Sequence, residues 1–253
     1  LAFFTSIFLI IGSYIFYNTN ILNEYHRPKY YEKRSADYEK KYKKFKNRAL
    51  PKITSVKGEV HLFPTDARVE FSGTYKMKNK TGSSIDTVHS NFSTRFPFTK
   101  YDWSIDNVLI QRDSIFGWDM YVFDPPIMPG DEFLLQFAGS QERRGFSNSG
   151  VNMTVVENGT LIFSSQIMPT FGYDPSRELS QKRTRKKYGL KEEQDPMPAY
   201  DDPEGLKNGI LGDDADWVDY EMIVSTDPDQ IAMTPGYLQN EWTEKGRRFF
   251  HYK

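Results

Sequence analysis

The 253-residue chain contains no cysteine, and it has only four histidines, at positions 26, 61, 89 and 251. The absence of cysteine excludes disulfide bonds, thiolate metal ligands and a cysteine nucleophile. A helix-borne zinc hydrolase site needs two histidines four residues apart with a glutamate beside them. The four histidines here are too widely separated to form that motif. His61 and His89 fall in predicted strands, where we expect ordinary sheet positions.

Other catalytic and binding signatures are also missing. The sequence holds no G-x-S-x-G elbow, no P-loop and no G-x-G-x-x-G turn. A net charge of −1 gives no reason to expect a nucleic acid as partner. Asp213, Asp214 and Asp216 form an acidic cluster without the glycine and distal glutamate of an EF-hand loop, so we expect a strand-entry loop there. The sequence therefore shows no catalytic centre.

Charged residues are absent from the start of the chain. The run LAFFTSIFLIIGSYIFYNTNILN, residues 1–23, has no Asp, Glu, Lys or Arg. As a helix it would be about 30 Å long, which matches the hydrocarbon core of a bilayer. A signal peptide would show a basic start, a shorter apolar stretch and an A-x-A-like cleavage site, none of which is present. We therefore predict a transmembrane helix at 1–23 rather than a buried core helix.

Residues 24–50 are strongly basic. Between residues 24 and 48, ten Lys and Arg residues accompany four Asp and Glu residues. Four aromatic residues lie near one helical stripe: Tyr31, Tyr38, Tyr42 and Phe45. This pattern predicts a juxtamembrane helix that serves as a stalk. The basic face could bind anionic lipid, or the stalk could be solvated with its aromatic stripe packed on the next domain.

Residues 51–253 are predicted to form a mainly β domain, an antiparallel β-sandwich or saddle-like sheet. Aromatic residues make up 15% of the chain, which favours strands over helices. Val69, Phe71 and Tyr75 alternate with polar or small residues, as expected when one sheet face is buried. Further strands are predicted at 85–92, 107–112, 119–123, 132–138, 152–156 and 160–166. Near the end, 213–238 predicts two strands joined by a proline-containing turn, followed by a short hairpin.

Residues 173–212 interrupt the strand pattern. The segment is charged, rich in proline and glycine, and poor in β-branched residues. We predict a long excursion with one or two short helices, returning to the sheet at Trp217. It carries a basic run made of Lys182, Arg183, Arg185, Lys186 and Lys187. This run could bind a partner or a phosphate, or it could be a solvated loop.

The order of strands and turns resembles a known family. The segment ITSVKGEVHLFPTDARVEFSGTYKMKNKTGSSIDTVHSNF is similar to the opening of the N-terminal β domain of M1-family zinc aminopeptidases, with its Asp-x-Arg turn and F-x-G-x-Y strand. PPIMPGDEFLLQFAGS resembles a later turn and strand of that domain, and residues 215–253 resemble its closing strands. NTNILNEY, KKYGL and DADWV resemble a bacterial subgroup in which the M1-like part is fused to ABC-2-type transporter permease spans.

The resemblance implies a non-catalytic β lobe that forms one wall of a peptide cleft. The family's G-x-M-E-N and HExxH signatures are absent, so the resemblance implies that zinc belongs to a catalytic domain outside this fragment. It also implies a weak substrate-binding role for Gln166, in TLIFSSQIMPTFGYD, near the free amino group of a peptide. The simpler alternative for Gln166 is a strand-end side chain bonded to the backbone.

The resemblance also bears on location and partners. The positive-inside rule would place residues 24–48 in the cytoplasm, but long domains follow that rule poorly. Because the M1-like part of such fusions is expected outside the cytoplasm, we predict an extracytoplasmic β domain anchored in the lipid bilayer. The expected partners are the protein's own catalytic domain and permease spans, and a peptide substrate. The alternative is a membrane-tethered β-sandwich binding module of a transporter without peptidase activity.

Overall fold

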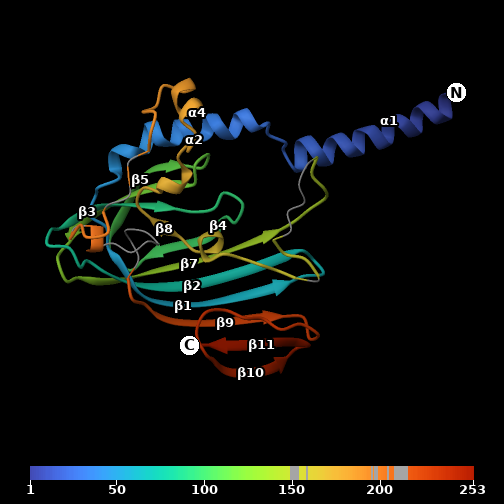
Figure 1. Ribbon diagram of the computed structural model, residues 1–253. Coiled ribbons are helices and arrows are strands. Elements are labelled where there is room, and N and C mark those ends of the chain that lie inside the picture. Colours follow the sequence, from blue (N-terminus) through green and yellow to red (C-terminus); the bar gives the residue numbers. More distant parts are fainter. Residues whose placement is uncertain (149–153, 158, 195, 197–198, 204, 208–215) are drawn as a thin grey trace.

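The computed structural model describes residues 1–148, 154–157, 159–194, 196, 199–203, 205–207 and 216–253, and in this part of the chain eleven strands form two sheets (Figure 1). The larger sheet has seven strands in the order β10-β11-β9-β1-β2-β7-β4, and the smaller has four in the order β5-β6-β3-β8. The prediction of a mainly β fold is confirmed. One pair of neighbouring strands differs from the predicted antiparallel arrangement: β1 and β9 are parallel.

The strands have the following bounds. The seven-stranded sheet contains β1 (Lys52–Phe63), β2 (Arg68–Lys78), β4 (Phe98–Trp103), β7 (Glu132–Glu142), β9 (Asp219–Thr226), β10 (Leu238–Glu244) and β11 (Arg247–Tyr252). The four-stranded sheet contains β3 (Ile85–Asn91), β5 (Asn107–Asp113), β6 (Trp118–Ile127) and β8 (Thr170–Phe171). The helices are α1 (Ala2–Phe16), α2 (Pro28–Tyr42), α3 (Ser164–Ile167) and α4 (Lys182–Lys187), with short turns η1 (Tyr17–Leu22), η2 (Lys43–Phe45), η3 (Pro175–Arg177) and η4 (Gly205–Lys207).

Three predicted strands differ from the structure. The predicted strand at 160–166 is wrong, because residues 160–163 lie outside any strand and 164–167 form the helical turn α3. Residues 154–156 of the predicted strand 152–156 are not in a strand, and residues 152 and 153 lie outside the described part. Between β9 and β10, residues 227–237 form a loop instead of the predicted second strand. The sheet resumes at Asp219, close to the predicted return at Trp217.

Two glycines in the large sheet give space to aromatic rings on neighbouring strands. Gly73 of β2 is opposite Phe137 of β7, and Gly139 of β7 is opposite Phe71 of β2. A Cβ added at Gly73 would lie 2.5 Å from the Phe137 ring, and one at Gly139 would lie 2.5 Å from the Phe71 ring. These reciprocal contacts explain the glycine of the F-x-G-x-Y pattern, since any side chain there would displace a core ring.

The main core lies between the two sheets and is dominated by aromatic side chains. Trp103 contacts Tyr121 and Phe123 of the small sheet and Phe133 of the large sheet, with ring centroids 5.3–5.9 Å apart. Edge-to-face and tilted contacts of this kind add to the stabilisation that apolar burial provides. The aromatic-rich composition therefore builds the contact between the sheets.

The helix α2 covers the outer face of the four-stranded sheet (Figure 1). Tyr38 and Tyr42 are each 1% exposed. Tyr42 stacks on Trp118 of β6 at 4.3 Å between ring centroids, and Tyr38 stacks on Tyr173 at 5.2 Å. The aromatic stripe seen in the sequence thus packs on the β domain, and the charged residues of α2 lie mostly on its other faces.

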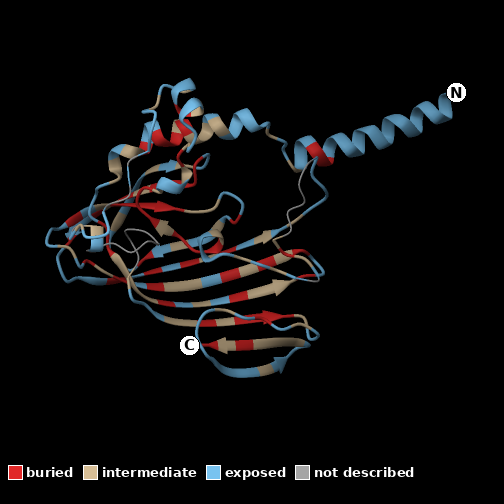
Figure 2. Cartoon of the chain, in the orientation of Figure 1, coloured by how far each residue is buried: buried red, intermediate tan, exposed pale blue. Residues whose placement is uncertain are grey.

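The N-terminal helix has the opposite environment. α1 and η1 form a continuous apolar helix, Ala2–Leu22, that projects away from the sheets, and most of it is exposed (Figure 2). By its 21-residue length and its composition this helix could cross a membrane. At its end, the Asn23 side-chain amide donates hydrogen bonds to the carbonyl oxygens of Arg144 and Phe146. These bonds tie the end of the helix to the segment that follows β7.

Candidate functional site: an arginine-lined pocket beneath α2

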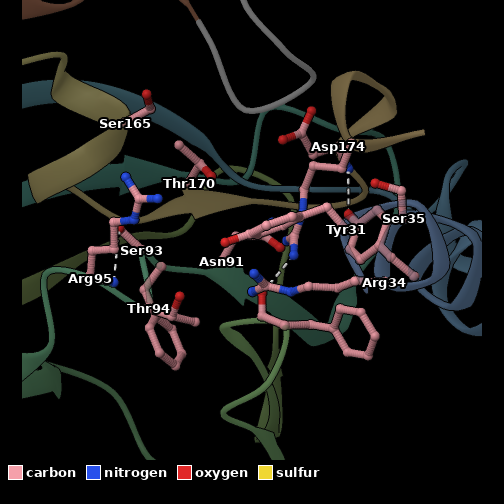
Figure 3. Close-up of a pocket in the computed structure, with 14 residues that line it drawn as sticks. Tyr31, Arg34, Ser35, Asn91, Ser93, Thr94, Arg95, Ser165, Thr170 and Asp174 are labelled. Atoms are coloured by element: carbon pink, nitrogen blue, oxygen red, sulfur yellow. Dashed lines mark hydrogen bonds between the residues drawn. The ribbon is translucent and has the colours of Figure 1, made fainter. Parts of the chain in front are cut away.

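A pocket of about 410 Å³ lies between α2, the end of β3 and the segment around Asp174 (Figure 3). The α2 side contributes Tyr31, Arg34, Ser35 and Tyr38, and the rest of the lining comes from Asn91, Phe92, Ser93, Thr94, Arg95, Phe116, Ser165, Thr170, Asp174 and Arg177. The pocket lies where α2 packs over the end of β3 and the residues that follow this strand. A pocket of this volume is in the range of small-molecule sites.

The charge in the pocket is unbalanced. Three of the lining residues are arginines, Arg34, Arg95 and Arg177, and Asp174 is the one carboxylate among them. The Asp174 carboxylate is already engaged, since it accepts hydrogen bonds from the backbone N–H and the hydroxyl of Ser176 at 2.9 and 2.6 Å. The pocket therefore carries an excess of positive charge.

Two of these arginines are fixed by neighbouring backbone and rings. An Nη2 of Arg177 donates to the carbonyl oxygen of Phe116 at 2.8 Å, and its guanidinium lies 4.0 Å from the centre of the Tyr38 ring. Arg34 donates from Nη2 to the carbonyl oxygen of Ile115, the preceding residue. The two guanidinium groups thus share one short segment of backbone as their support. Burial lowers the pKa of Arg177, and the nearby charge of Arg34 lowers it further.

Two buried polar atoms of the lining have no hydrogen-bond partner within the protein: Nε of Arg34 and Oδ1 of Asn91. Asn91 is 7% exposed, and its Nδ2 donates to the carbonyl oxygen of Gly172 at 2.6 Å. That bond fixes the amide so that Oδ1 is the remaining acceptor. Figure 3 shows Arg34 extending from α2 toward Asn91. Unpaired buried polar atoms are costly and uncommon, so these two atoms are the unsatisfied hydrogen-bonding groups of the lining.

The basic run of the excursion is occupied by partners within the chain. Arg185 of α4 is fully buried and donates two hydrogen bonds of 2.8 Å to the carboxylate of Glu39 on α2. Lys187 pairs with Glu32 at 2.7 Å, and Lys186 pairs with Glu192 at 3.3 Å. The run therefore holds α4 against α2, an outcome that neither the phosphate-site nor the solvated-loop interpretation anticipated.

Around this ion pair lies a small buried charge network. Lys43 contacts Glu39 at 3.1 Å and Glu178 at 3.2 Å, and the hydroxyl of Tyr173 donates to Glu178 at 2.8 Å. Burial alone would raise the pKa of Glu39, but the hydrogen bonds from Arg185 and Lys43 outweigh it, so its pKa lies below the usual value. The network is neutralised internally, and this distinguishes it from the arginine-lined pocket beside it.

Gln166 lies in the helical turn α3, not on a strand. Its Oε1 accepts a hydrogen bond from the backbone N–H of Phe163 at 2.8 Å, so the side chain caps the start of the turn. The neighbouring Ser165 lines the arginine-lined pocket, which places Gln166 at its margin. The structure thus gives this residue a bond to backbone, and its proposed contact with a peptide amino group stays a prediction.

The histidines are dispersed, as their sequence positions imply. His61 contacts the hydroxyl of Ser225 at 2.8 Å, and His251 contacts Glu221 at 3.1 Å. His89 is fully buried between Phe45 and Trp118, and burial lowers its pKa to about 4. Among the residues that the structure describes, no three His, Asp or Glu side chains gather to hold a metal ion. The described donor set does not fit a zinc site.

Sequence reasoning missed the pocket. Arg34 and Arg177 are far apart in the chain and belong to segments that were interpreted as a stalk and a loop. A useful signal was present, however, because Asp174, Pro175 and Arg177 form a short polar turn at the start of the predicted excursion, shortly after β8. The packing of α2 on the small sheet is what brings this turn to Arg34.

Comparison with known proteins gave matches to solved structures alone. No protein-family profile matches the chain, and no curated protein matches it. The crystal structure of a mutant M1 zinc metallopeptidase from Deinococcus radiodurans, bound to a Tyr-Ser-Ala substrate, is similar over 82% of this chain and 40% of its own, with 11% identity and a TM-score of 0.45. Another crystal structure of the M1 zinc metallopeptidase from that organism is similar over 82% and 39%, with 10% identity and a TM-score of 0.45. The chain spans about two fifths of the length of these structures.

Proposed function

We propose that this chain is the non-catalytic β lobe of a membrane-anchored, M1-like zinc aminopeptidase of the kind fused to ABC-2-type permease spans. In this proposal the lobe forms one wall of a peptide cleft outside the cytoplasm. Support comes from the order of the sequence motifs, since most strands of the segments that resemble the M1 β domain are neighbours in one sheet, while β3 and the end of β6 belong to the smaller sheet. β1, β2 and β7 lie side by side, and β9, β11 and β10 complete the same sheet on the other side of β1.

The observation that carries the proposal is an exposed apolar surface on the loop before β10. Ile231, Met233 and Tyr237 are 71, 83 and 83% exposed. Exposed apolar side chains on one segment are the kind of surface against which another domain or protein packs. The backbone of Tyr237 pairs with that of Lys253 through two hydrogen bonds of 2.7 and 3.0 Å. A polypeptide continuing from Lys253 would therefore leave the sheet beside these side chains and could cover them.

The chain's own residues would contribute position and enclosure, not the bond-breaking step. A rigid sheet that excludes water from one side of a cleft strengthens electrostatic contacts within the cleft and limits the poses of a peptide. Gln166 would hold the free amino group of the peptide with its side-chain carbonyl. Zinc and its ligands would belong to the catalytic domain, where the metal supplies an activated water.

The apolar helix Ala2–Leu22 would be the anchor. Its exposed side chains include Phe4, Phe8 and Ile10, at 73, 74 and 69% exposure, which is unfavourable in water and favourable in lipid. A membrane anchor predicts that the full chain stays in the membrane fraction after carbonate extraction. Deletion of residues 1–23 would then release the β domain into the soluble fraction.

The proposal is tested first by the reading frame that contains this chain. We expect an HExxH motif with a further glutamate about 20 residues on, within roughly 200 residues after Lys253. The longer protein should then hydrolyse an aminoacyl-anilide substrate, and Gln166→Ala should raise KM more than it lowers kcat. A frame that continues without these ligands, or a longer protein without peptidase activity, would refute the peptidase proposal.

A second candidate function is favoured by a separate observation. The arginine-lined pocket is formed by this chain alone and needs no catalytic domain to be complete. It therefore supports the alternative of a membrane-tethered binding module of a transporter, without peptidase activity. The two candidates differ in whether the longer protein hydrolyses peptides, so the aminoacyl-anilide assay distinguishes them.

A further inference from the structure

We propose that the arginine-lined pocket beneath α2 binds a small phosphate monoester through Arg34, Arg95 and Arg177. This inference goes beyond the proposed peptidase lobe, because a phosphate ligand has no place in peptide hydrolysis. It rests on three independent features of the described residues: the charge of the pocket, its unpaired polar atoms, and its aromatic surface.

The charge selects a dianion. The lining contains three guanidinium groups and one carboxylate, and that carboxylate already accepts two hydrogen bonds from Ser176. A phosphate monoester carries about two negative charges at neutral pH, which matches the excess. The planar guanidinium donates paired hydrogen bonds to phosphate oxygens, and arginine is the usual residue at such sites. Burial is the main cause of the lowered pKa of Arg177, and the positive charge of Arg34 acts in the same direction.

The unpaired atoms define the polar end of the ligand. Nε of Arg34 is a buried donor and Oδ1 of Asn91 a buried acceptor, and neither has a partner within the protein. A phosphate oxygen can accept from Nε, and a hydroxyl on the ligand can donate to Oδ1. Hydroxyl groups of Ser93 and Thr94 line the same region and offer further donors. A ligand with both phosphate and hydroxyl groups satisfies all these atoms at once.

The rest of the pocket suits a short organic group. Its volume of about 410 Å³ exceeds what a phosphate ion alone would fill. Tyr31, Tyr38 and Phe116 add aromatic surface to the lining, with the Tyr38 ring next to the Arg177 guanidinium and the Phe116 ring near that of Arg34. This combination of aromatic surface and a few polar groups is typical of small-molecule sites. The shared chemistry fits a soluble sugar or glycerol phosphate, and equally the phosphomonoester headgroup of a lipid.

The test uses the full chain in nanodiscs of neutral phosphatidylcholine. Isothermal titration with sn-glycerol 3-phosphate should give saturable binding in the wild type. Arg95→Ala and Arg34→Lys should each weaken binding about tenfold or more, because one removes a charge and the other a bidentate fork. Asn91→Asp should abolish binding, since it adds a negative charge at the polar end.

Lys33→Ala is the matched control. Lys33 is next to Arg34 on α2, its side chain is 71% exposed, and it pairs with Asp37. Its replacement removes a positive charge from the same helix, more than Arg34→Lys does, and should still change the affinity by less than about twofold. Equal weakening by Lys33→Ala and Arg34→Lys would overturn the proposal, because it would indicate unspecific attraction to a basic helix. Arg95 is exposed and its replacement is expected to leave the fold intact, so a loss of binding there reports on the pocket.

A second arm distinguishes the two sources of phosphate. In nanodiscs that contain phosphatidic acid, hydrogen exchange at residues 91–95 should slow down if the ligand is a lipid headgroup, and Arg95→Ala should remove this protection. Binding of the soluble ester in neutral nanodiscs assigns the soluble source instead. If the folded wild type shows neither effect, the pocket does not bind phosphate esters and the proposal fails. Neither result depends on peptidase activity, so the proposed function and this inference fail separately.

Discussion

Arg185 and Glu39, which are 146 residues apart in the sequence, form a buried ion pair with two hydrogen bonds of 2.8 Å. The pair joins α4 of the long excursion to α2, the helix that roofs the arginine-lined pocket. Arg185 also donates to the backbone carbonyl oxygens of Leu179 and Lys191, so its donors are largely satisfied. The excursion is therefore held to the stalk helix by this pair.

Arg185→Met is expected to lower the free energy of unfolding by about 3–5 kcal/mol, because it leaves the Glu39 carboxylate buried without its partner. Urea unfolding followed by circular dichroism measures this loss. Lys186→Met is the control, since Lys186 is exposed and should contribute less than about 1 kcal/mol. The double variant Glu39→Leu/Arg185→Met should recover most of the stability. A single variant that unfolds like the wild type would show that the pair is not the link between α4 and α2.

His89 is expected to make the fold sensitive to acid. Its pKa is about 4 in the folded chain and 6.5 when unperturbed, because burial and the charge of Arg48 disfavour its protonated form. Between these pH values the unfolded chain binds the proton and the folded chain does not. Stability from neutral His89 is therefore complete above pH 6.5 and lost as the pH falls to 4, by roughly 3 kcal/mol.

The measurement is the urea midpoint of the wild type and His89→Leu at several pH values from 7 to 4. The wild type should lose stability relative to His89→Leu as the pH falls, because the variant has no proton to take up. His26→Leu serves as the control, since His26 lies partly exposed near Glu24. Parallel pH profiles for wild type and His89→Leu would contradict the expectation.

Gly73→Ala is expected to destabilise the large sheet by about 1–3 kcal/mol, since the added Cβ would lie 2.5 Å from the Phe137 ring. Gly82→Ala is a suitable control because nothing lies within 4 Å of a Cβ at that position. Thermal unfolding of the two variants should separate clearly, with Gly82→Ala close to the wild type. Replacing Phe137 by Leu in the Gly73→Ala background should restore part of the loss, because it removes the ring in the way. No recovery would mean that the cost at Gly73 has another origin.

Gln166→Ala is expected to cost about 0.5–2 kcal/mol through loss of the bond to the Phe163 N–H. Gln166→Glu keeps the accepting oxygen and should retain most of that stability. Hydrogen exchange of the Phe163 amide compares the two variants directly. Equal exchange rates in wild type and Gln166→Ala would show that the cap does not hold the turn in solution.

Sequence patterns predicted the parts of the fold whose cause is local. The alternation of Val69, Phe71 and Tyr75 with polar or small residues predicted the buried face of β2, because successive side chains of a strand point to opposite faces of the sheet. The strand β4 was missed since a bulge between Phe98 and Lys100 breaks that alternation. Residues 160–166 have strand-like composition, yet strand propensity depends on a neighbouring strand being available.

The site depended on contacts that no local pattern contains. The aromatic stripe of α2 was visible, and with it the packing of the helix on the domain, but the partner surface of Trp118 and Tyr173 was not. Because the sequence did not predict that surface, it could not predict that Arg34 and Arg177 lie in the same pocket. The role of the basic run was missed for the same reason, because its partner Glu39 belongs to a distant helix.

The parallel pairing of β1 with β9 has a consequence for how the chain is made. Ser55 of β1 is opposite Asp219 of β9, and His61 is opposite Ser225. One side of β1 can therefore pair only after β9, which is synthesised much later, has been made. Contacts that close such long stretches of chain form slowly. Until β9 arrives, β1 presents an open edge of unpaired N–H and C=O groups on which other chains can build. A chain truncated before residue 219 would therefore be prone to aggregate. Pairing with β9 covers the open edge of β1 and removes this risk.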